Sequence, residues 1–303
     1  MARTRQPVSP RQKRQERAAI AFMLPWFIGA VGITLGPMVA SLYLSFTEYN
    51  LLTAPQWVGF DNYVAMANDP NVAKSLAVTF SYVLIGTPIN LVIALAVAMA
   101  LNRGLRGLNF YRSVYYLPSL LGGSVAVGVL WRRIFGSDGL VNQFLGLLGI
   151  ESDTSWVANP DSALWTLILL HAWTFGSAMV IFLAGLRQVP EELHEAASLD
   201  GAGATRKFWH VTLPLLTPIL FFNLVLGIIN SFTTFTQAYI VSGGTGAPAK
   251  STLFYALYLY QQAFGTRHAM GYASALAWLL FLIVGLLTAV NFWASRKWVH
   301  YAS

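Results

Sequence analysis

The sequence predicts an all-α integral membrane protein with six transmembrane helices, and three observations support this fold class. Hydrophobic residues make up 56% of the 303 residues and charged residues only 10%, whereas a soluble domain typically carries about 25% charged residues. Six apolar runs contain no Asp, Glu, Lys or Arg, and each is longer than about 18 residues, the length that marks a transmembrane helix. The runs lack the alternation of barrel strands, so helices must satisfy their backbone in lipid. They cover residues 19–46, 75–101, 113–131, 163–186, 212–240 and 270–295.

The distribution of basic residues predicts the orientation of these spans. With the tail of residues 1–18 inside, 14 of the 19 Lys and Arg residues fall on the cytoplasmic side, which agrees with the positive-inside rule. Both termini, including residues 296–303, are therefore expected in the cytoplasm. Contact with anionic lipid explains the basic tail without nucleic acid. The basic residues of the tail are Arg3, Arg5, Arg11, Lys13, Arg14 and Arg17.

Arg132 and Arg133 depart from this rule, because they fall at the outer end of the third span. We expect them to reach lipid head groups or to pair with Asp138. The overall asymmetry still determines the predicted topology.

The first span is expected to be a retained helix and not a cleavable signal. Its apolar run is much longer than the roughly 7–15 residues of a signal-peptide core, and no small-residue cleavage site follows it. Pro25 and Pro37 lie inside the run, where a kink or a tilt would absorb its excess length.

Two longer segments are expected on the outer side. Residues 47–74 are rich in Asn, Asp, Pro and aromatic residues and predict a folded cap. Its residues Trp57, Phe60 and Tyr63 form either an interfacial aromatic belt or a surface that meets a partner. Residues 134–162 contain GLVNQFLGLLGI, whose apolar spacing predicts a short helix along the membrane surface.

The polar loop of residues 187–210 separates the fourth and fifth spans on the cytoplasmic side. Pro190 suits the first turn of a helix, and Glu191 and Glu192 suit its positive end. Gly201 permits a chain reversal, and the next span begins at Leu213–Pro214. The loop therefore predicts a short helix that lies under the membrane and receives a push from a partner below. Its docking face is formed by Leu193, Ala196, Ala197 and Leu199.

This loop resembles the EAA loop of ABC-importer permeases. The match consists of Glu195-Ala196-Ala197, Gly201 six residues after the glutamate, and Val211-x-Leu213-Pro214. The family usually has Ile where this chain has Val211. The segments SFTEYN, VGFDNY, YRSVYYLP, NPDSALW and SRKW resemble the carbohydrate-uptake branch, the maltose or multiple-sugar type.

The resemblance implies a type I ABC importer permease fold and assigns the loop to coupling with an ATPase. The implied coupling residues are Glu191, Glu192, Leu193, Glu195, Ala196, Ala197, Leu199, Asp200, Gly201, Ala202, Leu213 and Pro214. It further implies four partners: a second homologous permease, two ABC ATPase subunits and an extracytoplasmic solute-binding protein. No glycine-rich Walker pattern occurs in the chain, so ATP and Mg²⁺ are expected on the ATPase, with no cofactor and no metal site here.

Polar side chains in the fifth span predict a path for a hydroxyl-rich solute. At helical spacing, Asn230, Thr233, Thr234 and Gln237 share one face that continues from Asn223. The alternative role for such residues is hydrogen bonding between helices. The resemblance to maltose-type permeases points to contacts at Asn230, Thr233, His171, Phe175, Ser119 and Gly123. Of these, Asn230 alone keeps the expected residue type.

The sequence thus predicts a permease subunit, and not an enzyme, in a bacterial or archaeal cytoplasmic membrane. It would form the path for a sugar or oligosaccharide and couple transport to ATP hydrolysis by a separate subunit. Glycerol-3-phosphate or a polyol is the alternative solute. A secondary carrier is a further alternative, but it would usually show buried acidic residues or broken helices in two repeats. A membrane enzyme is disfavoured because the five histidines are scattered.

Overall fold

The computed structural model describes residues 10–104, 107–266 and 268–300, and the side chains from residue 18 onwards. The start of the basic tail and the positions Arg106 and Arg267 lie outside the described residues. So do the side chains of Arg11, Lys13, Arg14 and Arg17. The proposed contact of the tail with lipid is therefore not addressed by the structure.

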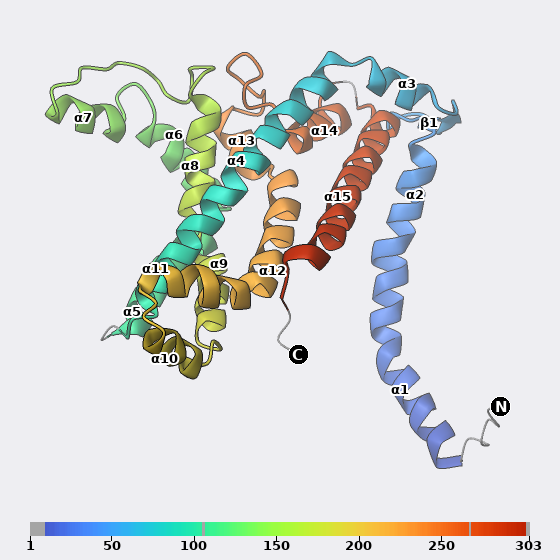
Figure 1. Ribbon diagram of the computed structural model, residues 1–303. Coiled ribbons are helices and arrows are strands. Elements are labelled where there is room, and N and C mark those ends of the chain that lie inside the picture. Colours follow the sequence, from blue (N-terminus) through green and yellow to red (C-terminus); the bar gives the residue numbers. More distant parts are fainter. Residues whose placement is uncertain (1–9, 105–106, 267, 301–303) are drawn as a thin grey trace.

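The first span is one long rod that stands apart from the other helices along most of its length (Figure 1). It consists of α1 (Pro10–Gly29), a π-helical stretch η1 (Ala30–Leu35) and α2 (Gly36–Leu44). Its apolar part, Ala18–Leu44, has no buried residue in its most apolar window. The main contacts of α2, and of the segment that follows it, with the bundle are made to α15 (Met270–Trp298).

The segment after the first span folds into a small cap. Two short strands, β1 (Thr47–Glu48) and β2 (Gln56–Trp57), pair antiparallel, and α3 (Asp61–Ala67) follows. The Asn62 side chain donates to the carbonyl oxygens of Ser45 and Thr47, both at 2.9 Å, which ties α3 to the end of the first span. The folded cap predicted for residues 47–74 is therefore present, with a strand pair that the sequence did not indicate.

The second span is α4 (Pro70–Leu101), the central helix of the bundle, and the next two spans are broken. The third span divides into α5 (Leu108–Leu121) and α6 (Val125–Ile134), which meet at 95°. The fourth divides into α8 (Ala163–Trp173) and α9 (Gly176–Leu186), which meet at 40°. Between them, α7 (Leu140–Leu147) lies at one end of the molecule beside α6 (Figure 1).

The short helix α10 (Glu191–Leu199) precedes the fifth span, which begins earlier than the predicted residue 212. It starts with α11 (Ala204–Lys207) and the π-helical stretch η2 (Phe208–Thr212). It continues through α12 (Leu213–Phe232) and α13 (Thr236–Val241), and together these form a 38-residue span. The short α14 (Tyr255–Phe264) leads to α15 as the last span.

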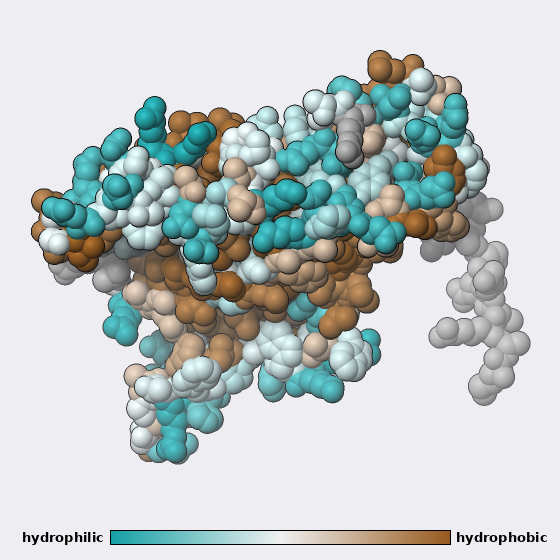
Figure 2. All heavy atoms as spheres, turned by 90° about the horizontal axis from the view of Figure 1, so that it is seen from above, coloured by the Kyte–Doolittle hydropathy of each residue, from teal (hydrophilic) through white to brown (hydrophobic). Residues whose placement is uncertain are grey.

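Two buried apolar clusters hold the bundle together. One joins α4 and α8 with α13 and α14 at the end that carries the cap, around Tyr82, Phe254 and Tyr255. The other joins α4, α9 and α12 towards the end that carries α10, around Phe182 and Leu216. Seen from the end with α3, α7 and α14, hydrophilic residues cover much of the surface and hydrophobic ones show between and beside them (Figure 2). Four helices are long and apolar enough to cross a membrane, and six spans result if each bent pair counts as one.

Candidate solute cavity and coupling helix

A cavity of about 580 Å³ lies among α4 and the fractured third, fourth and fifth spans. Seven of the eight predicted path residues line it: Asn230, Thr233, Thr234, Gln237, His171, Ser119 and Gly123. Phe175 is not among the lining residues. Its ring lies 6.1 Å from that of Tyr115, centroid to centroid, and packs against the buried cluster around Phe182.

The breaks in the third and fourth spans interlock beside this cavity. The Ser119 hydroxyl donates to the carbonyl oxygen of Thr174 at 2.9 Å and accepts from the backbone N–H of Ser177 at 2.9 Å. A Cβ at Gly122 would stand 2.2 Å from the Thr174 methyl group, so only glycine permits this approach. Ser119 therefore satisfies backbone groups that the break between α8 and α9 frees from helical hydrogen bonds.

Side-chain amides from other helices satisfy further carbonyl groups at the breaks. Asn90 on α4 donates to the carbonyl oxygen of His171 at 2.7 Å. Gln237 on α13 donates to that of Gly122 at 2.9 Å. Gln237 thus has the alternative role, hydrogen bonding between helices, and it also lines the cavity.

The prediction that Asn230, Thr233 and Gln237 share one face assumed a continuous helix. The fifth span is instead interrupted between α12 and α13. It breaks at Thr233–Phe235, and the Thr233 and Thr234 hydroxyls both donate to the carbonyl oxygen of Asn230, at 3.1 and 3.3 Å. The face argument still selected cavity residues, because Asn230 before the break, Thr233 and Thr234 within it, and Gln237 after it line the same cavity. Asn230 itself is exposed to the cavity.

The His171 side chain packs against neighbouring helices and also lines the cavity. Its ring is 5.3 Å from that of Tyr82, and its Nε2 is 3.5 Å from the Ser231 hydroxyl. A Cβ at Gly86 would stand 3.2 Å from the imidazole Cδ2, so α4 packs closely against this ring. These contacts fix the ring and leave one edge facing the cavity.

Sequence reasoning missed the contribution of the second span and parts of the fourth. Tyr82, Thr87 and Asn90 on α4 line the cavity, as do Thr174 and Ser177. Asn90 was the available signal, because an amide inside an otherwise apolar span needs a partner. All lining residues in the described part of the chain lack a formal charge, apart from the titratable His171.

At the opposite end from α7 and α14, α10 occupies the position predicted for the coupling helix (Figure 1). Gly201 ends it with φ of +74°. The N–H of Gly201 bonds to the carbonyl of Ser198 at 3.0 Å, and that of Ala202 bonds to the carbonyl of Ala197 at 2.9 Å. This pair of bonds is a Schellman motif, which uses a left-handed residue and thus favours glycine.

The surface of α10 is open. It has no buried residue, and the Leu199 side chain is 91% exposed. The Lys207 ammonium donates to the Ser198 hydroxyl at 2.5 Å, which links α10 to the start of the fifth span. Glu191 and Glu192 occupy its first turn, as predicted, and Pro190 is its N-cap. Leu213 and Pro214 stand at the start of α12.

In the described residues, no group of three or more His, Cys, Asp or Glu side chains could hold a metal ion. A multi-span helical bundle with a cavity at its helix breaks, and with an open helix at one end, is the architecture of a membrane permease.

The comparisons with known proteins place this permease in a family. A family model described as the inner membrane component of binding-protein-dependent transport systems matches residues 63–298, and the chain belongs to that family. The predicted relationship to ABC-importer permeases is confirmed. The protein is therefore a transport component of the inner membrane and not an enzyme.

Several relatives are similar over nearly their whole length. The probable ABC transporter permease protein YesP of Bacillus subtilis (strain 168) is 52% identical over 292 residues, or 96% of this chain and 94% of that protein. The lactose transport system permease protein LacF of Rhizobium radiobacter is 31% identical, covering 87% and 89%. The sn-glycerol-3-phosphate transport system permease protein UgpA of Brucella abortus biovar 1 (strain 9-941) is 33% identical, covering 92% and 97%.

A solved structure shows the same fold. A chain in the crystal structure of a bacterial alginate ABC transporter, in complex with an alginate pentasaccharide-bound periplasmic protein, superposes with a TM-score of 0.79. The sequences are 18% identical, and the match covers 94% of this chain and 96% of that chain. The predicted importer permease fold is thereby confirmed.

Proposed function

We propose that this permease forms the path for a sugar or oligosaccharide and couples its transport to ATP hydrolysis by a separate ATPase. The observation that carries the proposal is the cavity at the three helix breaks. Its lining combines amides, hydroxyls and aromatic rings, which suit a polyhydroxylated solute. The protein would hydrogen-bond the solute through Asn230, Asn223 and Thr233.

Saccharide is favoured over glycerol-3-phosphate by the charge of this cavity. A phosphate group is usually met by Arg or Lys, and neither lines the cavity in the described residues. The similarity to LacF supports a sugar, and the similarity to UgpA keeps the phosphoester as the second candidate.

Uptake by Asn230 variants tests the saccharide path. Asn230→Ala removes an exposed cavity amide, and we expect roughly a tenfold or greater loss of sugar uptake if one or two hydrogen bonds to the solute disappear. The matched control is Asn291→Ala in α15, whose amide bonds to the Leu287 carbonyl and does not line the cavity. A panel of radiolabelled sugars and glycerol-3-phosphate in intact cells gives the readout. Equal uptake by both variants for every solute would contradict the proposal.

The ATPase is expected to bind α10. This helix is open on its surface and ends in a rigid Schellman motif, so it suits docking in a partner's cleft. Its coupling residues would be those named above, from Glu191 to Ala202, with Leu213 and Pro214 at the base of α12. The ATPase, of which two copies are proposed, would bind ATP and Mg²⁺. Purification in mild detergent should retain an ATPase, and the Glu195→Lys/Gly201→Asp double change should release it.

A second homologous permease is proposed to cover the isolated first span. The rod of α1, η1 and α2 carries Gly32 and Gly36 four residues apart, a spacing that allows close helix approach in membranes. A Cβ at Gly32 would meet no atom of the described residues within 4 Å, so no other helix in the described part of the chain packs against this position. The solute-binding protein would meet the opposite end of the molecule from α10, with that end and the cap outside the cell.

A further inference from the structure

Arg132 and Arg133 remain unexplained by the solute cavity and by the coupling helix. They occupy the last turn of α6, with both side chains exposed, on the side where the positive-inside rule disfavours them. They line a pocket of about 720 Å³, which we name the Arg pocket. Its other polar side chains are Ser137, Asp138, Ser155 and Ser242.

The Arg pocket lies next to the solute cavity along one pair of helices. Helices α6 and α13 are in close contact, because a Cβ at Gly128 would stand 3.0 Å from the Ile240 side chain. Gly123 and Gln237 line the solute cavity at one end of this pair. Val129 and Val241 line the Arg pocket at the other end. The Arg pocket is thus the next hollow outward from the solute cavity, on the face opposite α10.

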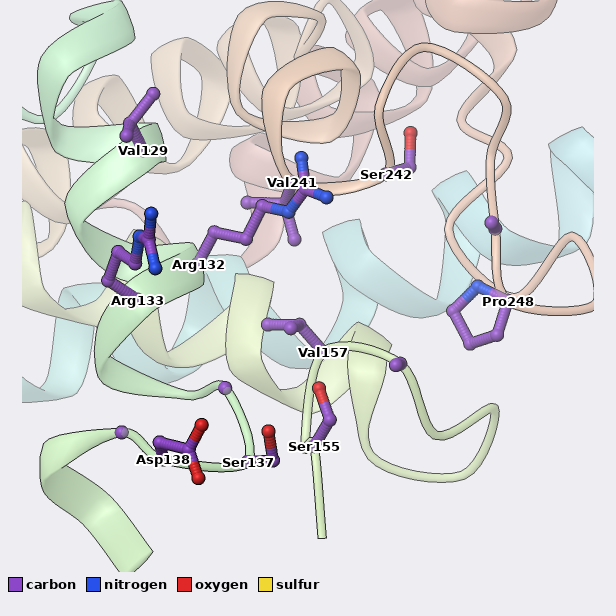
Figure 3. Close-up of a pocket in the computed structure, with 14 residues that line it drawn as sticks. Val129, Arg132, Arg133, Ser137, Asp138, Ser155, Val157, Val241, Ser242 and Pro248 are labelled. Atoms are coloured by element: carbon purple, nitrogen blue, oxygen red, sulfur yellow. The ribbon is translucent and has the colours of Figure 1, made fainter.

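The charged side chains line different sides of the Arg pocket. Figure 3 shows the Arg132 side chain extended towards Val241 and Ser242, whereas Asp138 and Ser137 lie on the far side of the pocket. A guanidinium group binds a carboxylate through two parallel hydrogen bonds, and serine hydroxyls add partners for sugar hydroxyls.

We propose that the Arg pocket binds the carboxylate of an acidic oligosaccharide, one that contains a uronic acid, before the saccharide enters the solute cavity. The inference rests on the proposed saccharide function and specifies its substrate class. The carboxylate would pair with Arg132 and Arg133, and neighbouring sugar hydroxyls would meet Ser137 and Ser155. In this bound state the carboxylate stays at the arginines of the Arg pocket. Neutral sugar units of the same oligosaccharide occupy the solute cavity, which has no Arg or Lys among its described lining residues.

Two other sources of negative charge could meet these arginines. A lipid phosphate would meet them at the membrane surface, but it would not use a hydroxyl-lined hollow. A small phosphoester would pair with the arginines and leave most of the 720 Å³ empty. The volume of the pocket and the hydroxyls of Ser137 and Ser155 therefore favour the saccharide.

Calorimetric titration of the full chain in phosphatidylcholine nanodiscs tests the proposal. The probes are trigalacturonic acid and its fully methyl-esterified form, which keeps the hydroxyls and loses the charge. We expect the acid to bind at least tenfold more tightly than the ester, and more weakly as salt is raised. The Arg132→Gln/Arg133→Gln double change should weaken acid binding at least tenfold. The matched control, Lys250→Gln, changes another exposed basic residue that lines a separate pocket and should leave binding unchanged.

Each alternative result overturns the inference. Equal binding of acid and ester, or unchanged binding in the double variant, would show that the Arg pocket is not a carboxylate site. Binding of sn-glycerol-3-phosphate without trigalacturonic acid would assign the arginines to a phosphoester. If neither probe binds and phosphatidylglycerol discs alone distinguish the variants, the arginines are lipid anchors. The uptake test at Asn230 concerns different residues, so it can succeed while this inference fails, and the reverse.

Discussion

At the residue scale, the Asp69 carboxylate joins three helices at the end of the molecule that carries the cap. It caps α4 by accepting from the backbone N–H of Asn71 at 2.8 Å. It also accepts hydrogen bonds from the hydroxyl groups of Tyr258 on α14 and Tyr272 on α15. Burial by itself would raise the pKa of this carboxyl, but these hydrogen bonds together hold the pKa below its ordinary value. The ionised form of Asp69 is therefore the form that the fold stabilises.

Asp69→Asn is expected to lower the melting temperature at neutral pH. Loss of hydrogen bonds to a charged group costs about 1–3 kcal/mol of stability. Because Asp69 is partly exposed, we expect a cost at the lower end of this range. Because the folded pKa is lowered, the stabilisation is present above the unfolded pKa of about 3.9 and disappears as the pH falls through the folded pKa. Thermal unfolding of both proteins from neutral to acidic pH should show a difference that closes below about pH 4. Asp161→Asn, at an exposed position, is the control. A difference that is independent of pH would contradict this account.

Gly201 is the second residue at this scale, and its backbone provides a test of the proposed coupling role. Its φ of +74° costs an L-residue roughly 1–2 kcal/mol, whereas a Cβ there would meet no atom within 4 Å. Gly201→Val should therefore disturb the end of α10 through backbone strain alone. We expect sugar uptake to be abolished while membrane insertion stays normal. Gly203→Ala is the matched control, since Gly203 has φ of −70° and equally open surroundings. Normal uptake by Gly201→Val would exclude the coupling role.

At the scale of elements, the helix breaks depend on small residues that let the broken ends approach. Gly122→Val would force a side chain against Thr174, whose methyl group lies 2.2 Å from the Cβ position. We expect a loss of about 1–3 kcal/mol or misassembly of the third and fourth spans. Gly123→Val changes the neighbouring residue, where a Cβ would meet nothing within 4 Å. Melting temperature and yield of folded protein in detergent measure the contrast. Equal values for the two variants would show that the breaks do not interlock in this way.

The same elements show how far sequence reasoning reached. Hydropathy predicted the six apolar segments because length and lack of charge are local properties. The glycine at the end of α10 was predictable because a chain reversal has a local signature. The helix breaks were not predictable, because the side chains that hydrogen-bond to the carbonyl groups at the breaks come from helices distant in the sequence. Asn90 bonds to His171 across 81 residues, and Gln237 bonds to Gly122 across 115. The cavity residues of α4 were missed for the same reason.

At the scale of the whole molecule, the two ends of the bundle differ in what they can bind. One end carries α10, with its open surface and the Lys207 link to the fifth span. The other carries the cap, α7, α14 and the Arg pocket. The solute cavity lies between them, at the breaks. A displacement of α10 would reach that cavity through the fifth span, whose 38 residues run from Ala204 to Val241. This arrangement suits a permease that couples motion at one end to solute release at the cavity.

The orientation of the molecule is the remaining prediction at this scale, and the absence of cysteine makes it directly testable. Single cysteines at Leu52, 87% exposed in the cap, and at Arg103, exposed after α4, mark the two ends. The positive-inside rule places Leu52 outside and Arg103 inside. A membrane-impermeant maleimide should therefore label Leu52→Cys in intact cells and Arg103→Cys only after permeabilisation. The parent chain without cysteine gives the background. The reverse pattern would put α10 outside the cell, away from any ATPase, and both the coupling proposal and the Arg pocket as an entry site would fall with it.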